Sequence, residues 1–383
     1  MGRKSVAVLD VRSSEITVFV GERGVNNTFV FKANRSEPYD GYEDGKFYNV
    51  KGLAEAVFKA LTSVEHMCGE RIKELFVGVP GEFCAVVPKE QNVGFSKKRK
   101  ITQKDVETLY ASGAGDLNGY RLIRATSMIY VTADNRRVVD PIGLPSTSLS
   151  GVLSYFYCSD YFADVMHAMF KTTRIALRFL PTEAAMASYL IPPETRDEYA
   201  LFLDVGYLSS SILVLLGGGV KAQKSYWTGR AQIVVLIMER LNVPYDVAGA
   251  LLARANLFAR GGEGKVEFNY RGNPYEIDTD LLIETVKEGL DGLCEPISEF
   301  LEGCSGREFD YRPLYVTGEG ITDIRGALEY VSKRINRICE EVAPDLPYYN
   351  KPAMSSRIAL MDMAQDDRQK GGIINRLLNA FGG

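Results

Sequence analysis

The sequence holds few of the residues that build metal sites or disulfide scaffolds. Its 383 residues include two histidines and six cysteines, and no two cysteines stand close enough to form a CxxC pair. Structural zinc sites and disulfide frameworks depend on such closely spaced ligands. The sequence therefore predicts free thiols and a core held by hydrophobic packing.

Long apolar runs and a strong excess of one charge are also absent. The densest apolar run, SILVLLGGGV, is much shorter than the about 20 residues of a membrane-spanning helix. The first residues, MGRKSVAVLDV, lead directly into a short strand without a secretory signal, which predicts a cytoplasmic protein. With 45 basic and 49 acidic residues the formal net charge is −4, which argues against a surface built to hold nucleic acid.

The residues that are present are those of an ordinary globular protein. Hydrophobic residues make up 46% and charged residues 25%, and the length suits two or three domains. Residues 1–80 read as short strands between turn signals, and a helix is predicted over residues 51–67 because apolar side chains recur there at helical spacing. This pattern indicates an α/β unit.

A different pattern follows over residues 85–175. The segment FSKKRKITQKDVETLY is polar and basic, and we interpret SKKRK as a solvated loop. Thr102 and Asp105 have the spacing of a capping box, which predicts that a helix begins near Gln103. With strand-like runs and a helix from residue 160, this part is expected to form an inserted subdomain.

The α/β pattern then restarts and resembles its own beginning. The first start reads VAVLDVRSSEITVFVGERGV and the second reads ALFLDVGYLSSSILVLLGGGV, so that Asp10 and Asp204 occupy matching places. Self-similarity of this kind predicts a duplicated unit, and chance likeness between two hairpins is the alternative. Further on, the pattern predicts helices over residues 230–254, with a break at Pro244, and over residues 279–302, with a hairpin between them.

Two such turns carry the groups that grip the phosphates of a nucleotide. Aspartates at the strand ends would hold Mg²⁺, usually through water, while turn amides and hydroxyls would contact phosphate. The glycine turn in VTGEGITDIRG would let the backbone approach an adenine ring. The candidate metal ligands are Asp10 and Asp204, and the candidate nucleotide-binding residues are Asp10, Ser13, Ser14, Asp204, Gly206, Ser209, Ser210, Gly318 and Gly320.

These motifs in this order resemble FtsA, a family of bacterial actin-like division proteins. The stretches ELFVGVPGEFC, NVGFSKKRKITQKDVETL and RVVDPIGLPSTSLSG resemble the segment that leads into and forms the family's inserted 1C subdomain. The resemblance implies an α/β protein with the actin-like ATPase fold, built from duplicated ribonuclease H-like lobes. The implied parts are 1A (residues 1–84 and 176–193), 1C (85–175), 2A (194–227 and 303–364), 2B (228–302), and a linker with a C-terminal amphipathic helix (365–383).

The resemblance also implies a function. It describes an adaptor that links FtsZ-type filaments to the inner face of the cytoplasmic membrane at the division site. The implied partners are the C-terminal peptide of FtsZ, received by 2B, other copies of the chain in filaments, and an anionic membrane surface. ATP with Mg²⁺ is the implied cofactor, and Glu183 is the implied catalytic residue if the chain is active.

The final segment, GGIINRLLNAFGG, fits the membrane role. Its apolar residues fall on one stripe of a helix, and such a short helix is marginal in water without an apolar partner. A membrane would supply that partner, and the alternative is a helix docked on its own domain. The predicted membrane residues are Ile373, Ile374, Leu377, Leu378 and Phe381.

Several positions depart from the family's nucleotide motifs. The first loop has Arg12 where a glycine is usual, so we expect strain there, and the second has Tyr207 and Leu208 where small residues are usual. A later signature reads Ala248-Gly249 with no following lysine, and Thr228-Gly229 replaces a glycine pair. These changes predict a degenerate nucleotide site and a chain that is not an enzyme. The alternatives are an ATP-hydrolysing actin-like filament protein and a peptide-docking adaptor like PilM.

Overall fold

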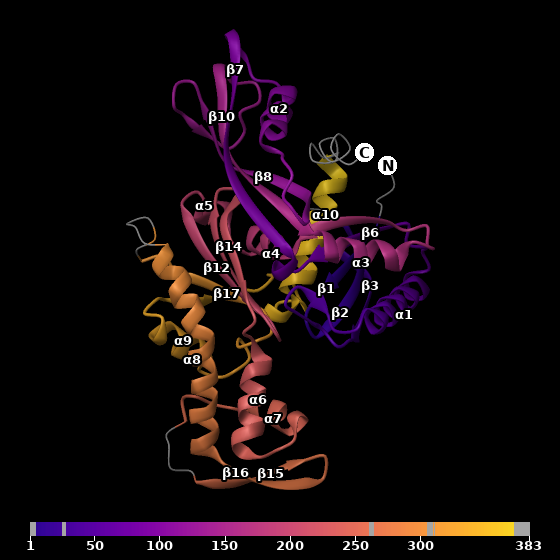
Figure 1. Ribbon diagram of the computed structural model, residues 1–383, viewed down its shortest axis with the longest axis vertical. Helices are drawn as coiled ribbons and strands as arrows, with labels where there is room; N and C mark the ends of the chain where they lie inside the picture. The colour runs from indigo at the N-terminus through magenta and orange to yellow at the C-terminus, as the bar shows by residue number, and fades with distance from the viewer. Residues whose placement is uncertain (1–4, 25–27, 260–263, 305–308, 310, 371–383) are drawn as a thin grey trace. The chain divides into compact units, whose positions relative to one another are not determined.

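The computed structural model describes residues 5–24, 28–259, 264–304, 309 and 311–370 (Figure 1). The chain forms two compact units, and it passes between them several times. The first comprises Met1–Ala200, Leu213–Lys224 and Met354–Gly383, and the second comprises Leu201–Ile212 and Ser225–Ala353.

Two five-stranded sheets share one strand order. The first runs β11-β6-β1-β2-β3 and the second runs β18-β17-β12-β13-β14. The first consists of β1 (Val6–Val11), β2 (Glu15–Arg23), β3 (Phe29–Pro38), β6 (Glu74–Val79) and β11 (Ala176–Pro181). The second consists of β12 (Tyr199–Val205), β13 (Ser210–Leu216), β14 (Gly219–Tyr226), β17 (Leu314–Thr317) and β18 (Cys339–Glu341). The duplication predicted from the two Leu-Asp-Val hairpins is confirmed.

The apolar residues of β1 and α1 account for their burial in the first unit. Every residue of β1, VAVLDV, is buried, as expected for a strand that is covered on both faces of its sheet. Helix α1 (Val50–Cys68) follows the predicted helix within one residue at each end, and Asn49 caps it by accepting a hydrogen bond from the Gly52 amide. Its buried residues include Leu53, Val57, Leu61 and Val64, the periodic apolar positions.

The inserted subdomain is a four-stranded sheet, β7-β10-β8-β9, covered by one helix. Its elements are β7 (Cys84–Lys100), α2 (Gln103–Gly113), β8 (Tyr120–Thr132), β9 (Arg137–Val138) and β10 (Pro145–Ser159). The interpretation of SKKRK as a loop is wrong, because β7 continues to Lys100 and pairs there with the start of β10. Strand pairing outweighs the low strand propensity of this basic run.

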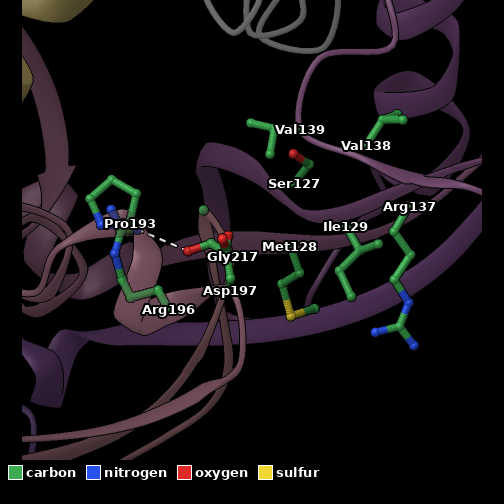
Figure 2. Close-up of a pocket in the computed structure, with 11 residues that line it drawn as sticks. Ser127, Met128, Ile129, Arg137, Val138, Val139, Pro193, Arg196, Asp197 and Gly217 are labelled. Carbon is green, nitrogen blue, oxygen red and sulfur yellow. Dashed lines mark hydrogen bonds between the residues drawn. The ribbon is translucent and has the colours of Figure 1, made fainter.

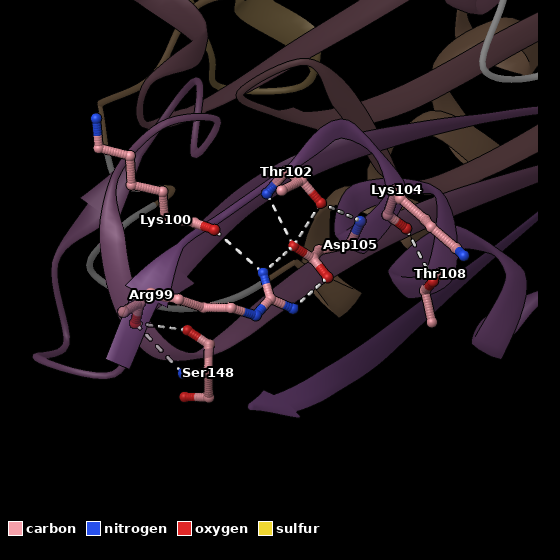
Figure 3. Close-up of polar contacts among 8 residues, drawn as sticks. Arg99, Lys100, Thr102, Lys104, Asp105, Thr108 and Ser148 are labelled. Atoms are coloured by element: carbon pink, nitrogen blue, oxygen red, sulfur yellow. Dashed lines mark hydrogen bonds and ion pairs between the residues drawn. The ribbon is translucent and has the colours of Figure 1, made fainter. Parts of the chain in front are cut away.

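The predicted helix start at Gln103 is confirmed, and Figure 3 shows the reason. The Asp105 carboxylate accepts hydrogen bonds from the Thr102 amide at 2.8 Å and from both terminal nitrogens of Arg99 at 2.6 and 2.7 Å. Arg99 in turn lies over the Phe95 ring, 3.9 Å from its centroid. One carboxylate therefore joins the end of β7 to the start of α2.

The remaining elements complete the two units. Pro244 separates α6 from α7 as predicted, and the hairpin turn lies at Arg271 and Gly272, which both have positive φ. These elements are β4 (Tyr42–Glu43), β5 (Lys46–Phe47), α3 (Asp160–Phe170), α4 (Thr182–Leu190), α5 (Pro193–Arg196), α6 (Arg230–Leu241), α7 (Tyr245–Leu252), β15 (Lys265–Tyr270), β16 (Asn273–Asp278), α8 (Thr279–Gly303), α9 (Ala327–Arg334) and α10 (Ser355–Lys370).

Helix α10 corrects the domain division drawn from the sequence. Residues 355–364 were expected in the second lobe and residues from 365 in a linker, but α10 is one helix to Lys370 and belongs to the first unit. Arginine–carboxylate pairs hold it there: Arg23 binds Asp362 at 2.7 Å and Asp366 at 2.9 Å, and Arg368 binds Glu74 at 2.6 Å. These pairs join residues too far apart in the chain for a local pattern to reveal.

Replacing Asp105 with asparagine should destabilise the inserted subdomain by about 1–2 kcal/mol, through loss of a helix cap and a charged pair. Hydrogen bonds from Arg99 hold the pKa of Asp105 well below its ordinary value. The carboxylate therefore stabilises the fold above the unfolded pKa of about 3.9, and this stabilisation is lost as pH falls through the folded pKa. Urea denaturation at pH 7 measures the loss. Asp116→Asn, at an exposed position, is the matched control, and equal midpoints for the two variants would contradict the assignment.

Candidate functional site

The first candidate loop joins β1 to β2 in the first unit. Asp10 lies near the end of β1, opposite Thr17 of β2, and is fully buried. The turn closes through a hydrogen bond from the Arg12 amide to the Glu15 carbonyl at 3.0 Å, and the Tyr39 hydroxyl donates to the Arg12 carbonyl at 2.7 Å. The strain expected at Arg12 is not found, because Arg12 is not among the residues with positive φ.

The Asp10 carboxylate is held by two consecutive residues of α10. The Ser356 hydroxyl donates to Oδ2 at 2.7 Å, and Nε of Arg357 lies 3.7 Å from the same oxygen. Arg357 also forms an ion pair with Glu15, and its side chain is 13% exposed. A buried carboxylate needs a compensating charge or hydrogen bonds, and α10 supplies both to the predicted Mg²⁺ ligand.

Glu183 lies in the first turn of α4, in the first unit, and is 2% exposed. Burial raises the pKa of the Cys84 thiol, and the nearby negative charge of Glu183 raises it further. The predicted catalytic carboxylate is therefore enclosed beside the start of β7.

The second candidate loop, between β12 and β13, is closed by its own backbone. The Gly206 amide donates to the Ser209 carbonyl at 2.8 Å. The first amides of α6 donate back to the loop, Arg230 to the Gly206 carbonyl at 3.1 Å and Ala231 to the Tyr207 carbonyl at 2.8 Å. These hydrogen bonds occupy groups at the helix start that would otherwise suit an anion.

Two serine hydroxyls at the start of β13 are also engaged within the protein. Ser210 donates to the Thr228 carbonyl at 2.6 Å, and the Ser211 and Ser225 hydroxyls lie 2.8 Å apart. The Tyr207 hydroxyl lies 2.5 Å from that of Tyr245 on α7, so the bulky side chain is tied to a neighbouring helix. Burial raises the pKa of Tyr207, which stays protonated at neutral pH.

The glycine turn after β17 packs directly on this loop. Gly318 has φ +98°, and a Cβ added to it would lie 2.4 Å from Asp204 Oδ1 and 2.3 Å from the Val205 carbonyl oxygen. The Gly320 amide donates to the same carbonyl at 2.8 Å. These glycines were predicted to make room for an adenine ring, and the contacts show that packing against the Asp204 loop already requires them.

The structure therefore brings the candidate residues together in two clusters, one in each unit. Asp10, Ser13 and Ser14 share the β1–β2 turn, and Asp204, Gly206, Ser209, Ser210, Gly318 and Gly320 gather around the β12–β13 turn. The predicted membrane residues Ile373, Ile374, Leu377, Leu378 and Phe381 lie outside the described residues.

Comparison with known proteins agrees with the resemblance found in the sequence. No protein-family model matches the chain. The cell division protein FtsA of Pseudomonas aeruginosa is 20% identical over 334 residues, which cover 85% of this chain and 80% of that protein. FtsA of Streptococcus pneumoniae is 29% identical over 105 residues, which cover 27% of this chain and 23% of that protein.

Solved structures share the fold. The PilM-PilN type IV pilus biogenesis complex contains a chain with a TM-score of 0.63 and 13% identity, covering 95% of this chain and 99% of that one. MreB5 of Spiroplasma citri bound to ADP gives a TM-score of 0.57 and 10% identity, covering 96% of this chain and 99% of that one. The chain therefore resembles FtsA in sequence and has the actin-like fold.

Sequence reasoning missed Ser356 and Arg357 in this FtsA-like protein. They lie more than 340 residues from Asp10 in the chain, and the segment MSSRIAL carries no motif that marks a site. The only signal was indirect. A buried aspartate at the end of a central strand requires a partner from some other element, and the sequence did not say which.

Replacing Arg357 with glutamine should destabilise the first unit by about 3 kcal/mol, because it leaves Asp10 buried without its cation. Arg136→Gln, which breaks an exposed pair with Asp134, should cost at most about 0.5 kcal/mol and serves as control. Adding Asp10→Asn to Arg357→Gln should recover part of the loss. Additive losses in this double-mutant cycle, measured by denaturant titration, would show that the two residues are not coupled.

Proposed function

We propose that this FtsA-like protein is an adaptor of bacterial cell division that links FtsZ-type filaments to the inner face of the cytoplasmic membrane. The observation that carries the proposal is the inserted four-stranded sheet with α2, which occupies the place in the chain where the sequence resembles the family's 1C subdomain. The likeness to Pseudomonas FtsA, which spans the insertion and both lobes, supports the same role.

The proposed filament contact is the C-terminal peptide of FtsZ, received by the helical part of the second unit. There α6 packs against α7 and α8, α8 contacts β16 of the β15–β16 hairpin, and several large apolar side chains are exposed. The exposed fractions of Phe258, Tyr245 and Val266 are 57%, 42% and 39%. Exposed apolar side chains of this kind suit an apolar peptide face.

The proposed membrane contact is the C-terminal segment, residues 371–383. Within the described ranges, no helix is both long enough and apolar enough to cross a bilayer. A short amphipathic helix would instead lie in the headgroup region, and filament formation would strengthen attachment by presenting many copies.

We further propose that the adaptor works without hydrolysing ATP. Some of the groups that would receive Mg²⁺ and phosphate are engaged in contacts within the protein. Arg357 and Ser356 contact the Asp10 carboxylate. The Gly206 amide donates to the Ser209 carbonyl within the turn, and the Ser210 hydroxyl donates to the Thr228 carbonyl. MreB5 of Spiroplasma citri is described with ADP bound, so the fold itself admits nucleotide and the difference would lie in these residues.

Vesicle flotation tests the membrane role. The full chain should float with vesicles made of equal parts phosphatidylcholine and phosphatidylglycerol. Leu377→Asp with Leu378→Asp should abolish flotation, because the carboxylates would lie on the face that is buried against the acyl chains and would be repelled by anionic lipid. Asn375→Asp with Asn379→Asp adds the same charge on the opposite face and should weaken flotation only partly. Equal flotation of both double variants would remove the membrane claim.

Binding of an FtsZ C-terminal peptide tests the partner. A labelled peptide should bind the full chain, and Val266→Asp should weaken binding severalfold, whereas Val30→Asp on β3 should leave it unchanged. Both valines are partly exposed, at 39% and 42%, so neither change should unfold the protein. Absence of binding to the unaltered chain would favour a paralogue with a different partner.

A further inference from the structure

A cavity of about 500 Å³ lies within the first unit, where β8 and β9 meet α5 and the β13–β14 turn (Figure 2). Its apolar lining comes from Met128, Ile129, Val138, Val139 and Pro193. It is separate from the Asp10 and Asp204 loops, since no residue of either loop lines it.

The walls of the cavity are fixed by backbone contacts. Gly217 has φ +55°, and a Cβ on it would lie 2.0 Å from the Met128 carbonyl oxygen, so the turn sits directly on β8. Arg196 donates to the Gly217 carbonyl and to the Ile191 carbonyl, both at 2.9 Å, and so ties α5 to the same turn. The cavity is therefore part of the fold and does not depend on one side-chain rotamer.

The lining favours an apolar occupant. Val139 is 88% exposed, which is unfavourable for an aliphatic side chain beside an apolar cavity. The charged residues of the lining are Arg137, Arg196 and Asp197, and Asp197 is exposed to solvent. An occupant that matches the rest of this lining is apolar.

Helix α10 brings the rest of the chain to the same face of the inserted sheet. Arg124 of β8 donates to both carboxylate oxygens of Asp367, at 2.8 and 2.9 Å, three residues before α10 ends. In the β8–β10 register Arg124 is opposite Phe156 and Ile129 is opposite Val152, two positions of β10 that face the same way. Arg124 and Ile129 therefore share a face, about 16 Å apart along the strand.

We propose that residues 371–383 of the same chain dock in this cavity when no membrane is present. As a helix these 13 residues would span about 20 Å, enough to reach from the end of α10 to the cavity. Their apolar stripe would cover Val139 and Met128. This inference rests on the proposed function, which assigns the apolar stripe to lipid. In the chain that is not attached to a membrane the stripe is covered by the cavity, and anionic lipid displaces it from the cavity.

Hydrogen exchange of the full chain tests the docking directly. Leu377→Asp with Leu378→Asp should speed amide exchange severalfold at residues 127–129 and 137–139, whereas Asn375→Asp with Asn379→Asp should not. Unchanged exchange in the first variant would overturn the proposal. Protection that appears only at high protein concentration would also overturn it, since a second copy would then be the occupant.

Vesicle binding tests the release. Val139→Asp should free the tail and raise the affinity for vesicles of equal parts phosphatidylcholine and phosphatidylglycerol severalfold, while Val30→Asp should not. An unchanged affinity would contradict competition between cavity and lipid. If no variant binds vesicles, the proposed membrane role fails, and the exchange measurement still decides whether the tail docks.

Discussion

The tie between α10 and the first sheet is the interaction on which the rest of the account depends. Arginine–carboxylate pairs attach this helix along its length, through Arg357 at its start and through Arg23, Arg124 and Arg368 further on. Most of these side chains are largely buried, where such pairs are costly to break. These pairs fix the position of α10 on the first unit, and with it the positions of the side chains of α10.

Two functional consequences follow from that position. At its start, α10 places Ser356 and Arg357 on Asp10, the residue that would otherwise be offered to a metal ion. Near its end, Asp367 accepts a hydrogen bond from Arg124 of β8, a strand that also lines the apolar cavity. One helix thus connects the state of the first candidate loop with the starting point of the proposed membrane segment.

Much of the fold was predictable from the sequence because its signals are local. The Leu-Asp-Val hairpins around Asp10 and Asp204 predicted the duplication, and the spacing of Thr102 and Asp105 predicted the start of α2. The strand at SKKRK was not predictable from its own residues, because its partner strand begins some 45 residues later at Pro145. Long-range pairing decided that segment, as it decided the unit to which α10 belongs.

The candidate site also has one part that was predictable from the sequence and one part that was not. The clustering of Asp204, Gly206, Gly318 and Gly320 was expected from motif order, whereas the Arg357 contact with Asp10 was not, because nothing in the sequence links residues so distant. Tyr207 and Leu208 suggested a degenerate site by bulk alone. The structure adds that the Gly206 amide and the Ser210 hydroxyl donate hydrogen bonds within the protein.

Calorimetric titration of the full chain with ATP and Mg²⁺ measures the central claim most directly, that these loops serve the protein's own packing and not a nucleotide. The account predicts no saturable heat at micromolar protein. A one-to-one isotherm with low-micromolar affinity would contradict it and would identify a working nucleotide site.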